Sequence, residues 1–362
     1  MSFTLVALDH TPFIHRCIAL AEYGCGHTGI NPMVGAVLVR DEKIIIEAFH
    51  EEFGSLHAEA LLIKKCVQKI QQEDRLYINL EPCCYTEKKT PPCTDAIIKS
   101  GIKHVIVGML DPNPQVSGKG IEQLRKNGIE VIFPIERARC VWFNRGFVSL
   151  MVKSRPWITM KKAQTWSGAI AGEDGSKMKI TNTEQDAWSH QYLRSKHDAI
   201  LVGVETVVTD DPLLTFRMKN EELPAGRSIG EGWRMKNEQP LRIVLDPQLR
   251  IPLTAKVVSG EMAKGTMVVT KQAEDTEVTE EAKEQMEKLR ERGVRVVSIP
   301  LNDAGVFAMQ ELFHVLTTPT KDFHGLTSIL VEGGRKTWEA FRKANAVDCE
   351  VMLIGKKQSH IA

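Results

Sequence analysis

The sequence lacks three features that would mark a membrane-bound, secreted or nucleic-acid-binding protein. No apolar run approaches the roughly 20 residues that a membrane-spanning helix needs. The N-terminal residues have no basic start followed by a long apolar stretch, so we expect no secretory signal. Charge is nearly balanced, with 47 Lys and Arg against 46 Asp and Glu, which argues against bulk electrostatic binding of nucleic acid.

What remains is the composition of an ordinary globular protein. Hydrophobic residues make up 43% of the chain and charged residues 26%, which excludes the fibrous and disordered classes. A length of 362 residues predicts two domains, or three, at about 150 residues per domain. We expect a cytoplasmic homo-oligomer, a dimer or a tetramer, that binds neither nucleic acid nor membrane.

The eight cysteines are not expected to form a disulfide framework, because the chain is long and no secretory signal is expected. Cys83, Cys84 and Cys93 fall within eleven residues. Clustering of this kind in a reducing compartment predicts metal or redox chemistry. The other five cysteines are typical of single buried thiols.

Hydrophobic periodicity predicts alternating strands and helices in two halves, with a boundary near residue 150. In the first half we expect helices at 11–23, 56–71, 94–100 and 121–127, and strands at 34–38, 43–48, 76–80, 104–109 and 129–132. In the second half we expect helices at 183–194, 310–316 and 338–344, and strands at 157–161, 199–202, 241–245, 266–269, 295–299, 328–331 and 351–354. The alternation predicts α/β layers with mainly parallel sheets.

Two polar segments interrupt the second half. Residues 218–240 form a polar insert rich in Gly and Pro, and a five-residue near-repeat in this region indicates a local duplication in a surface loop. Residues 272–292 are dense in charge, which predicts a helix with a solvated face.

The first half carries a set of residues typical of zinc-dependent deaminases. His57 and Glu59 open a predicted helix, Cys83 follows a predicted strand, and Cys93 opens the next helix. One His and two Cys supply three zinc ligands and leave the fourth tetrahedral position for water, which is the pattern of a catalytic site. Zinc lowers the pKa of such a water towards about 7, and Glu59 is placed to shuttle protons. A helix N-terminus favours the thiolate form of cysteine.

Each element alone is weak evidence, because a single His-x-Glu or Pro-Cys pair usually has no functional meaning. All three elements in this order are a strong signal. Cys84 is the alternative to Cys83 as the ligand, and the position after Glu81-Pro82 favours Cys83.

The chain resembles the family of bifunctional deaminase/reductases of riboflavin biosynthesis from about residue 11 to residue 355. The most specific segments are 31–37 (NPMVGAV), 57–59 (HAE), 80–83 (LEPC), 90–93 (TPPC) and 111–114 (DPNP). The long gap between the two Pro-Cys elements is unlike the short Cys-x-x-Cys of nucleoside and tRNA deaminases. The resemblance implies a cytidine-deaminase-like three-layer domain at 1–150. It further implies that Glu59 is the proton shuttle and that zinc is bound by His57, Cys83 and Cys93. Asn31 and His50 are implied to line the pyrimidine pocket.

The second half resembles the reductase domain of the same family. Matching segments are 161–168 (KKAQTWSG), 193–194 (LR), 198–203 (DAILVG), 210–217 (DDPLLTFR) and 331–334 (VEGG). The resemblance implies a dihydrofolate-reductase-like domain at 151–362 that transfers hydride from NADPH to the ribosyl group of the substrate. The implied catalytic residues are Lys161, Asp210 and Glu332. The implied substrate-binding residues are Lys177, Arg194, Leu214 and Arg217, and the implied cofactor-binding residues are Gln164, Lys179, Thr206, Asp210, Gly333 and Gly334.

Four departures from the family pattern concern the loop between the zinc cysteines and the reductase half. The loop between Cys83 and Cys93 has nine residues, one more than usual. We expect either that Lys88 or Lys89 contacts the substrate phosphate, or that both lysines are solvated. Ser167 replaces an Asp, and Lys179 replaces a Trp. Family members typically continue beyond the position of Ala362 with the last strands of the reductase sheet, so we expect a C-terminally short reductase domain.

The leading hypothesis is a zinc- and NADPH-dependent bifunctional enzyme. It hydrolyses the exocyclic 2-amino group of a diaminopyrimidinone ribosyl phosphate, releasing ammonia, and then reduces the ribosyl group to ribityl. The alternative is a deaminase alone, with the second domain a non-catalytic binding or dimerisation module. Deamination of nucleic acid is a third hypothesis, which the long gap between the cysteines and the neutral charge disfavour.

Overall fold

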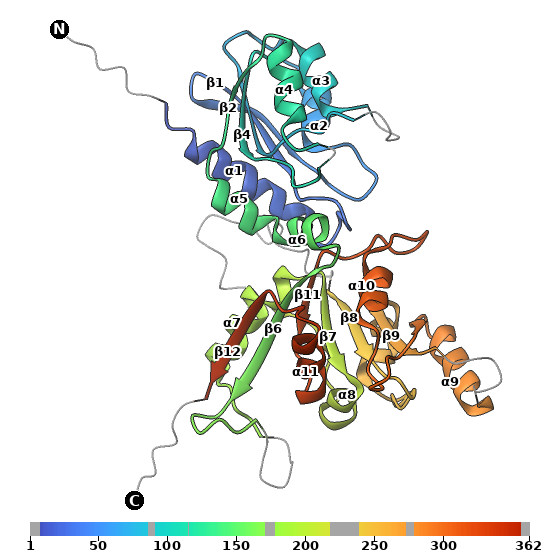
Figure 1. Ribbon diagram of the computed structural model, residues 1–362. Coiled ribbons are helices and arrows are strands. Elements are labelled where there is room, and N and C mark those ends of the chain that lie inside the picture. The colour runs from blue at the N-terminus through green and yellow to red at the C-terminus, as the bar shows by residue number, and fades with distance from the viewer. Residues whose placement is uncertain are drawn as a thin grey trace, which may run out of the picture. The chain divides into compact units, whose positions relative to one another are not determined.

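The computed structural model describes residues 8–85, 91–114, 116–170, 178–217, 239–272 and 279–355. The chain divides into two compact units between Ser154 and Arg155 (Figure 1). Most of the predicted insert, including both copies of its near-repeat apart from Arg217, lies outside the described residues. No described helix is long and apolar enough to cross a membrane.

The described strands of the first unit form one sheet of five, in the order β2-β1-β3-β4-β5. Their bounds are β1 Gly35–Arg40, β2 Lys43–Phe49, β3 Arg75–Leu80, β4 His104–Met109 and β5 Glu130–Ile132. The hairpin β1–β2 is antiparallel, β1 also pairs antiparallel with β3, and β3, β4 and β5 run parallel. Because β3 and β4 are parallel, the segments that follow them leave from the same edge of the sheet.

Helices cover both faces of this sheet, which makes three layers (Figure 1). α1 and α5 lie on one face, and α2, α3 and α4 lie on the other. The helices of the unit are α1 Thr11–Ala21, α2 Ala58–Lys65, α3 Cys93–Ser100, α4 Lys119–Lys126, α5 Arg137–Phe143 and α6 Arg145–Lys153. The pattern of the sequence did not predict α5 and α6. Gly35 lies where α1 crosses β1, and a Cβ there would come 2.1 Å from the carbonyl oxygen of Cys17.

The helix predicted at 56–71 is wrong in its second half, because α2 ends at Lys65. A contact distant in sequence holds the next residues in another conformation. Arg40 donates to both carboxylate oxygens of Asp74, at 2.7 and 2.8 Å, and to the carbonyl oxygen of Lys69 at 2.9 Å. The N–H of Gln71 also donates to Asp74. These bonds satisfy backbone groups that a continuing helix would have used itself.

The described strands of the second unit form one sheet of seven, in the order β10-β9-β8-β7-β11-β6-β12, and neighbouring strands run parallel throughout. The strands are β6 Trp157–Gln164, β7 Ala199–Gly203, β8 Leu241–Leu245, β9 Thr266–Lys271, β10 Arg295–Ile299, β11 Ser328–Val331 and β12 Cys349–Ile354. Every strand predicted in either half is present, and so is the mainly parallel pairing.

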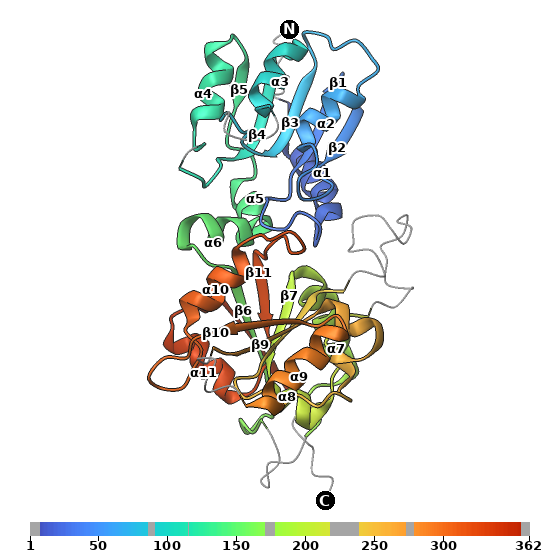
Figure 2. The same ribbon diagram turned by 90° about the vertical axis from the view of Figure 1, so that its right-hand side faces the viewer.

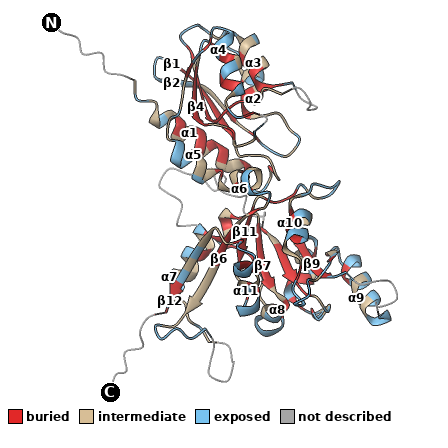
Figure 3. Ribbon diagram, in the orientation of Figure 1, coloured by how far each residue is buried: buried red, intermediate tan, exposed pale blue. Residues whose placement is uncertain are grey.

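Alternate residues of the central strands enter two separate cores, one on each face of the sheet. On β7, Leu201 packs into a core with α10 and α11, whereas Ile200 packs into a second core with residues of α8 and α9. The central strands are therefore buried over their length, as Figure 3 shows. Figure 2 shows α10 and α11 on one side of the sheet and α8 and α9 on the other.

The helices of the second unit are α7 Thr183–Tyr192, α8 Val204–Asp210, α9 Glu280–Glu291, α10 Met309–Thr317 and α11 Arg335–Lys343, with a 3-10 helix at Arg194–Lys196. α9 confirms the helix predicted from the charge-dense segment. Its buried residue, Leu289, faces the sheet, while its glutamates and lysines are mostly exposed.

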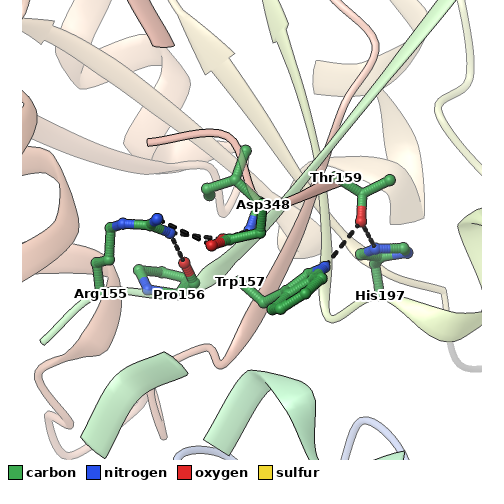
Figure 4. A network of polar contacts seen from close by, with 7 residues as sticks. Arg155, Pro156, Trp157, Thr159, His197 and Asp348 are labelled. Atoms are coloured by element: carbon green, nitrogen blue, oxygen red, sulfur yellow. Dashed lines mark hydrogen bonds and ion pairs between the residues drawn. The ribbon is translucent and has the colours of Figure 1, made fainter. Parts of the chain in front are cut away.

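A buried polar network fixes the amino ends of β6 and β12 (Figure 4). Asp348 accepts two hydrogen bonds from Arg155, at 2.6 and 2.9 Å, and one from the N–H of Ile158 at 2.8 Å. Beside it, the hydroxyl of Thr159 lies 2.8 Å from His197 Nε2 and accepts from the indole of Trp157 at 3.2 Å. These contacts fix β6, the strand that carries Lys161, against its neighbours.

Candidate active sites

The three residues predicted to bind zinc come together in the first unit. His57 is the N-cap of α2, Cys93 is the first residue of α3, and Cys83 lies just beyond the end of β3. His57 Nδ1 lies 3.6 Å from Cys83 Sγ and 3.3 Å from Cys93 Sγ. All three donor atoms lie within 4.8 Å of one another. Tetrahedral zinc at ordinary bond lengths separates its ligand atoms by about 3.5–3.8 Å, so this donor set fits the ion.

The thiols of Cys83 and Cys84 are neighbours in the sequence, but their surroundings differ. Hydrogen bonding from Cys93, together with the nearby His57, lowers the pKa of Cys83 to about 4. Burial raises the pKa of Cys84, whose side chain does not belong to the cluster. Cys83 is therefore the thiol that is prepared to ligate as thiolate.

Glu59 lies in the first turn of α2, next to the cluster, and is 3% exposed. Its Oε2 atom is buried and makes no hydrogen bond to any residue that the structure describes. Burial raises the pKa of Glu59, although His57 acts in the opposite direction. A buried oxygen without a partner among the described residues, beside three side chains that could hold a metal ion, suits a group that exchanges protons with a bound molecule.

Asn31 and His50 lie beside the same cluster. His50 Nδ1 is 3.1 Å from the carbonyl oxygen of Leu56 and Nε2 is 3.4 Å from Asn31 Nδ2. A carbonyl only accepts, so Nδ1 carries the proton and Nε2 accepts from the amide of Asn31. The ring of His50 meets that of His57 edge-on at 5.4 Å. The fold thus gathers all five predicted deaminase ligands and pocket residues, together with Glu59.

A second cluster of charged groups lies in the other unit. Glu332 follows β11 and accepts two hydrogen bonds of 2.7 Å from Arg194, while Lys161 Nζ lies 3.7 Å away. Arg194 also donates to the carbonyl oxygen of Thr215 at 2.8 Å. Burial alone would raise the pKa of Glu332, but Arg194 and Lys161 lower it to about 2. The cluster therefore holds an ionised carboxylate between two cations.

A cavity of about 410 Å³ opens beyond the carboxyl ends of β7, β8 and β11. Parallel α/β sheets bind their ligands at this edge. The predicted cofactor residues Thr206 and Gly334 line the cavity. Gly333 is adjacent, and a Cβ on it would lie 3.0 Å from Thr337. The first residues of α11 line the cavity, and no side chain caps this end of the helix.

The remaining predicted residues of the reductase half are placed as follows. Leu214 is buried with φ of 49°, and the N–H of Arg217 donates to His190 at 3.0 Å. Asp210 ends α8 and is exposed, as is Lys179, and Gln164 ends β6. Neither Asp210, Lys179 nor Gln164 lines the cavity. Lys177, Lys88 and Lys89 lie outside the described residues.

Sequence reasoning missed several residues of these sites. Arg250 and Lys336 line the cavity, and His190 contacts the segment that carries Arg217. They come from separate loops and helices, and a single lysine or arginine on such an element carries no motif. Only the folded sheet brings them to one edge.

Comparisons with known proteins agree with both sites. Residues 156–355 match the model of the RibD C-terminal domain, and residues 8–109 match that of the cytidine and deoxycytidylate deaminase zinc-binding region. The riboflavin biosynthesis protein RibD of Aquifex aeolicus is 38% identical over 345 residues, which cover 95% of this chain and 86% of that protein. The chain belongs to the RibD family. RibD of Actinobacillus pleuropneumoniae is 35% identical, covering 98% of this chain and 86% of that protein.

Solved structures of RibD proteins share the fold. RibD of Acinetobacter baumannii superposes with a TM-score of 0.75 at 28% identity, covering 96% of this chain and 86% of that one. A deaminase/reductase from Thermotoga maritima gives 0.73 at 32% identity, covering 96% and 87%. The predicted cytidine-deaminase-like and reductase folds are confirmed.

As a RibD-family protein, the chain is a bifunctional enzyme of riboflavin biosynthesis. It deaminates a diaminopyrimidinone ribosyl phosphate with zinc and then reduces the ribosyl group with NADPH. Nothing in the comparisons supports the alternative of a deaminase alone. Its substrate is a small phosphorylated pyrimidine.

Proposed function

We propose that the first unit, 1–150 by the sequence boundary, carries the deaminase and that His57, Cys83 and Cys93 bind its zinc. Zinc bound there lowers the pKa of a water ligand towards about 7. Glu59 would act as the proton shuttle, with its Oε2 holding a proton and returning it to the ring nitrogen or to the leaving amine. The observation that supports this role is the buried Oε2, which has no partner among the described residues.

Asn31 and His50 line the pyrimidine side of this site. His50 is held in one tautomer by Leu56, which directs its Nε2 towards the amide of Asn31. A planar amide held in this way can pair with the hydrogen-bonding edge of a flat heterocycle. The formal net charge of +1 over the whole chain suits a single small substrate better than a polynucleotide.

The second unit, from 151 onwards, carries the reductase. Gly333 and Gly334 at the start of α11, together with Thr206, would hold NADPH in the cavity, and the cofactor would supply the hydride. Lys161 and Glu332 face the reacting sugar. Arg194 keeps Glu332 ionised and in place. Arg217 and Leu214 would bind the substrate phosphate, and Asp210, Gln164 and Lys179 belong to the same predicted set. Lys177, also predicted there, lies outside the described residues.

The oligomeric state and the compartment are part of the same proposal. In the described sheet of the second unit β12 is an edge strand, and its Met352 and Ile354 are more than two-fifths exposed, as are Trp188 and Tyr192 of α7. Exposed apolar residues on a sheet edge favour pairing with another copy of the chain. All eight cysteines lie in the described residues and none is disulfide-bonded, which suits the reducing cytoplasm. Light scattering on the purified protein tests the oligomer.

A two-stage assay with the purified chain tests the proposal as a whole. Ammonia release is measured first, and NADPH consumption is then measured on the deaminated product. We expect both steps, in that order. Ammonia release without NADPH consumption would support the second unit as a binding module only, and ammonia release from cytosine or adenosine substrates would revive the nucleic-acid hypothesis.

A further inference from the structure

Glu81 is a buried carboxylate that no part of the chemistry above uses. It is 2% exposed and stands two residues before Cys83. Its Oε2 accepts from the backbone N–H of Asp111 at 3.1 Å and of Gly118 at 2.9 Å. Its Oε1 accepts from the N–H of Gly120 at 3.0 Å and of Ile121 at 3.2 Å. One side chain thus satisfies four backbone donors.

Three of these donors belong to the start of α4. The N-cap of this helix, Gly118, has φ of 79° and no side chain to cap the first turn. A helix start leaves N–H groups without partners inside the helix and carries partial positive charge. The carboxylate of Glu81 supplies the missing cap from the end of β3, so α4 is tied directly to the segment that carries Cys83.

Backbone packing strengthens this tie. Gly120, in the first turn of α4, lies so close to Pro82 that a Cβ on it would be 2.3 Å from the carbonyl oxygen of Pro82. The N–H of Glu81 also donates to the carbonyl oxygen of Met109 at 2.9 Å, which extends the pairing of β3 with β4. The peptide before Cys83 is therefore held by β4 on one side and by α4 on another.

α4 also holds the second cysteine segment. Gln123 accepts a hydrogen bond from the hydroxyl of Thr94 and donates to the carboxylate of Asp95, each at 3.1 Å. Thr94 and Asp95 are the two residues that follow Cys93 in α3. Their segment is linked back to the first cysteine, because the N–H of Thr94 donates to the carbonyl oxygen of Cys83 at 3.2 Å.

We propose that α4 is a brace for the metal centre, with Glu81 and Gln123 as the positioning residues that set the spacing of Cys83 and Cys93. The inference rests on the proposed zinc ligands. It also gives a role to the 111–114 turn that the sequence singled out, because the N–H of Asp111 is one of the four donors. Loss of the brace loosens the thiolate pair without removing a ligand, so zinc affinity falls while the reductase unit is unaffected.

Glu81→Gln tests the brace in the full-length protein. The amide keeps the shape but places an N–H₂ group against backbone N–H donors, which removes two acceptor bonds. We expect zinc to bind about 10- to 100-fold more weakly in competition with a chromophoric chelator, the usual effect of losing a residue behind the ligands. The absorption bands of the cobalt-substituted protein should shift, which reports on the geometry of the two thiolates. NADPH consumption on deaminated substrate should stay within about twofold of wild type.

Two further variants keep the result decisive. Gln123→Leu removes the link to α3 with little change of volume, and we expect zinc binding that is about threefold weaker, from the loss of two partly buried hydrogen bonds. Glu122→Gln is the matched control, since Glu122 is exposed on the same helix and pairs with Lys126. It should leave zinc affinity and the cobalt spectrum unchanged.

The outcomes separate this proposal from the one on which it rests. Cys83→Ala should abolish tight zinc binding, and if it does not, the proposed ligand set is wrong. If Cys83→Ala loses zinc but Glu81→Gln and Gln123→Leu both keep wild-type affinity and wild-type cobalt bands, the brace is wrong. If Glu81→Gln does not fold, unchanged values for Gln123→Leu alone overturn the brace.

Discussion

Glu59 is the residue on which the proposed deamination depends most directly. Glu59→Gln keeps the size of the side chain but removes its ability to exchange protons, so kcat for ammonia release should fall by about 100- to 10,000-fold. Zinc content should be unchanged, as measured by atomic emission. The reductase of the same molecule is an internal control and should keep its rate on deaminated substrate. Ammonia release at the wild-type rate would exclude Glu59 as the proton shuttle.

His190 gives the second unit a stability that depends on pH. Burial, reinforced by Arg194, lowers the pKa of His190 to about 4 from its ordinary 6.5. The unfolded chain therefore binds more protons than the folded chain between these two values. The contribution of the neutral ring is fully present above about pH 6.5 and is lost as the pH falls towards 4.

A substitution isolates this contribution. His190→Gln keeps an acceptor for the N–H of Arg217 but does not titrate. Urea unfolding at pH 7 and pH 4.5 should show that the wild type loses more free energy of unfolding on acidification than the variant does. Equal losses in the two proteins would show that His190 has the same pKa in the folded and the unfolded chain.

At the scale of the element, β12 and the residue just before it offer a matched pair of carboxylates. Asp348 and Glu350 each bind an arginine, but Asp348 is 2% exposed in its side chain and Glu350 is 41% exposed. Asp348→Ala removes the buried carboxylate that accepts from Arg155 and from the N–H of Ile158, although Arg155 keeps its bond to the carbonyl oxygen of Pro156. The free energy of unfolding should therefore fall by about 3 kcal/mol. Glu350→Ala should change it by less than about 1 kcal/mol.

Calorimetry of the second unit's unfolding transition checks this difference. The two variants remove the same kind of group from positions two residues apart, so the loss of one negative charge is common to both. Similar shifts in Tm for Asp348→Ala and Glu350→Ala would mean that burial of the network in Figure 4 does not determine its contribution to stability.

At the scale of the whole molecule, each unit has its own sheet and its own core. The two activities should therefore be separable by removing one cofactor. Dialysis against a chelator should abolish ammonia release and leave NADPH consumption on deaminated substrate unchanged, and added zinc should restore the first activity. A parallel loss of both activities would show that the metal also supports the second unit.

The positions of the strands and the zinc motif could be predicted from local information. A parallel strand buried on both faces is a short apolar run between turn residues, so Ser328–Val331 is visible in the sequence itself. His57, Cys83 and Cys93 are likewise recognisable, because the chemistry of zinc demands those side chains next to helix and strand ends. The fold class followed from the same alternation.

Contacts between distant segments were not visible in this way. α2 ends at Lys65 because Arg40, at the end of β1, binds Lys69 and Asp74 in the segment that follows the helix. The ion pair of Arg194 with Glu332 joins groups 138 residues apart, and no local pattern records that Arg194 would face a buried carboxylate.

Local chemistry therefore determined which side chains are available, and the tertiary structure decided which of them meet. Glu81 shows the difference, because its position before Cys83 is visible in the sequence but its hydrogen-bond partners are not. Its four donors come from residues 111–121, and only the pairing of β3 with β4 brings them to its carboxylate. A hydrogen-bond partner is a property of position in space, and a sequence motif carries only the spacing along the chain.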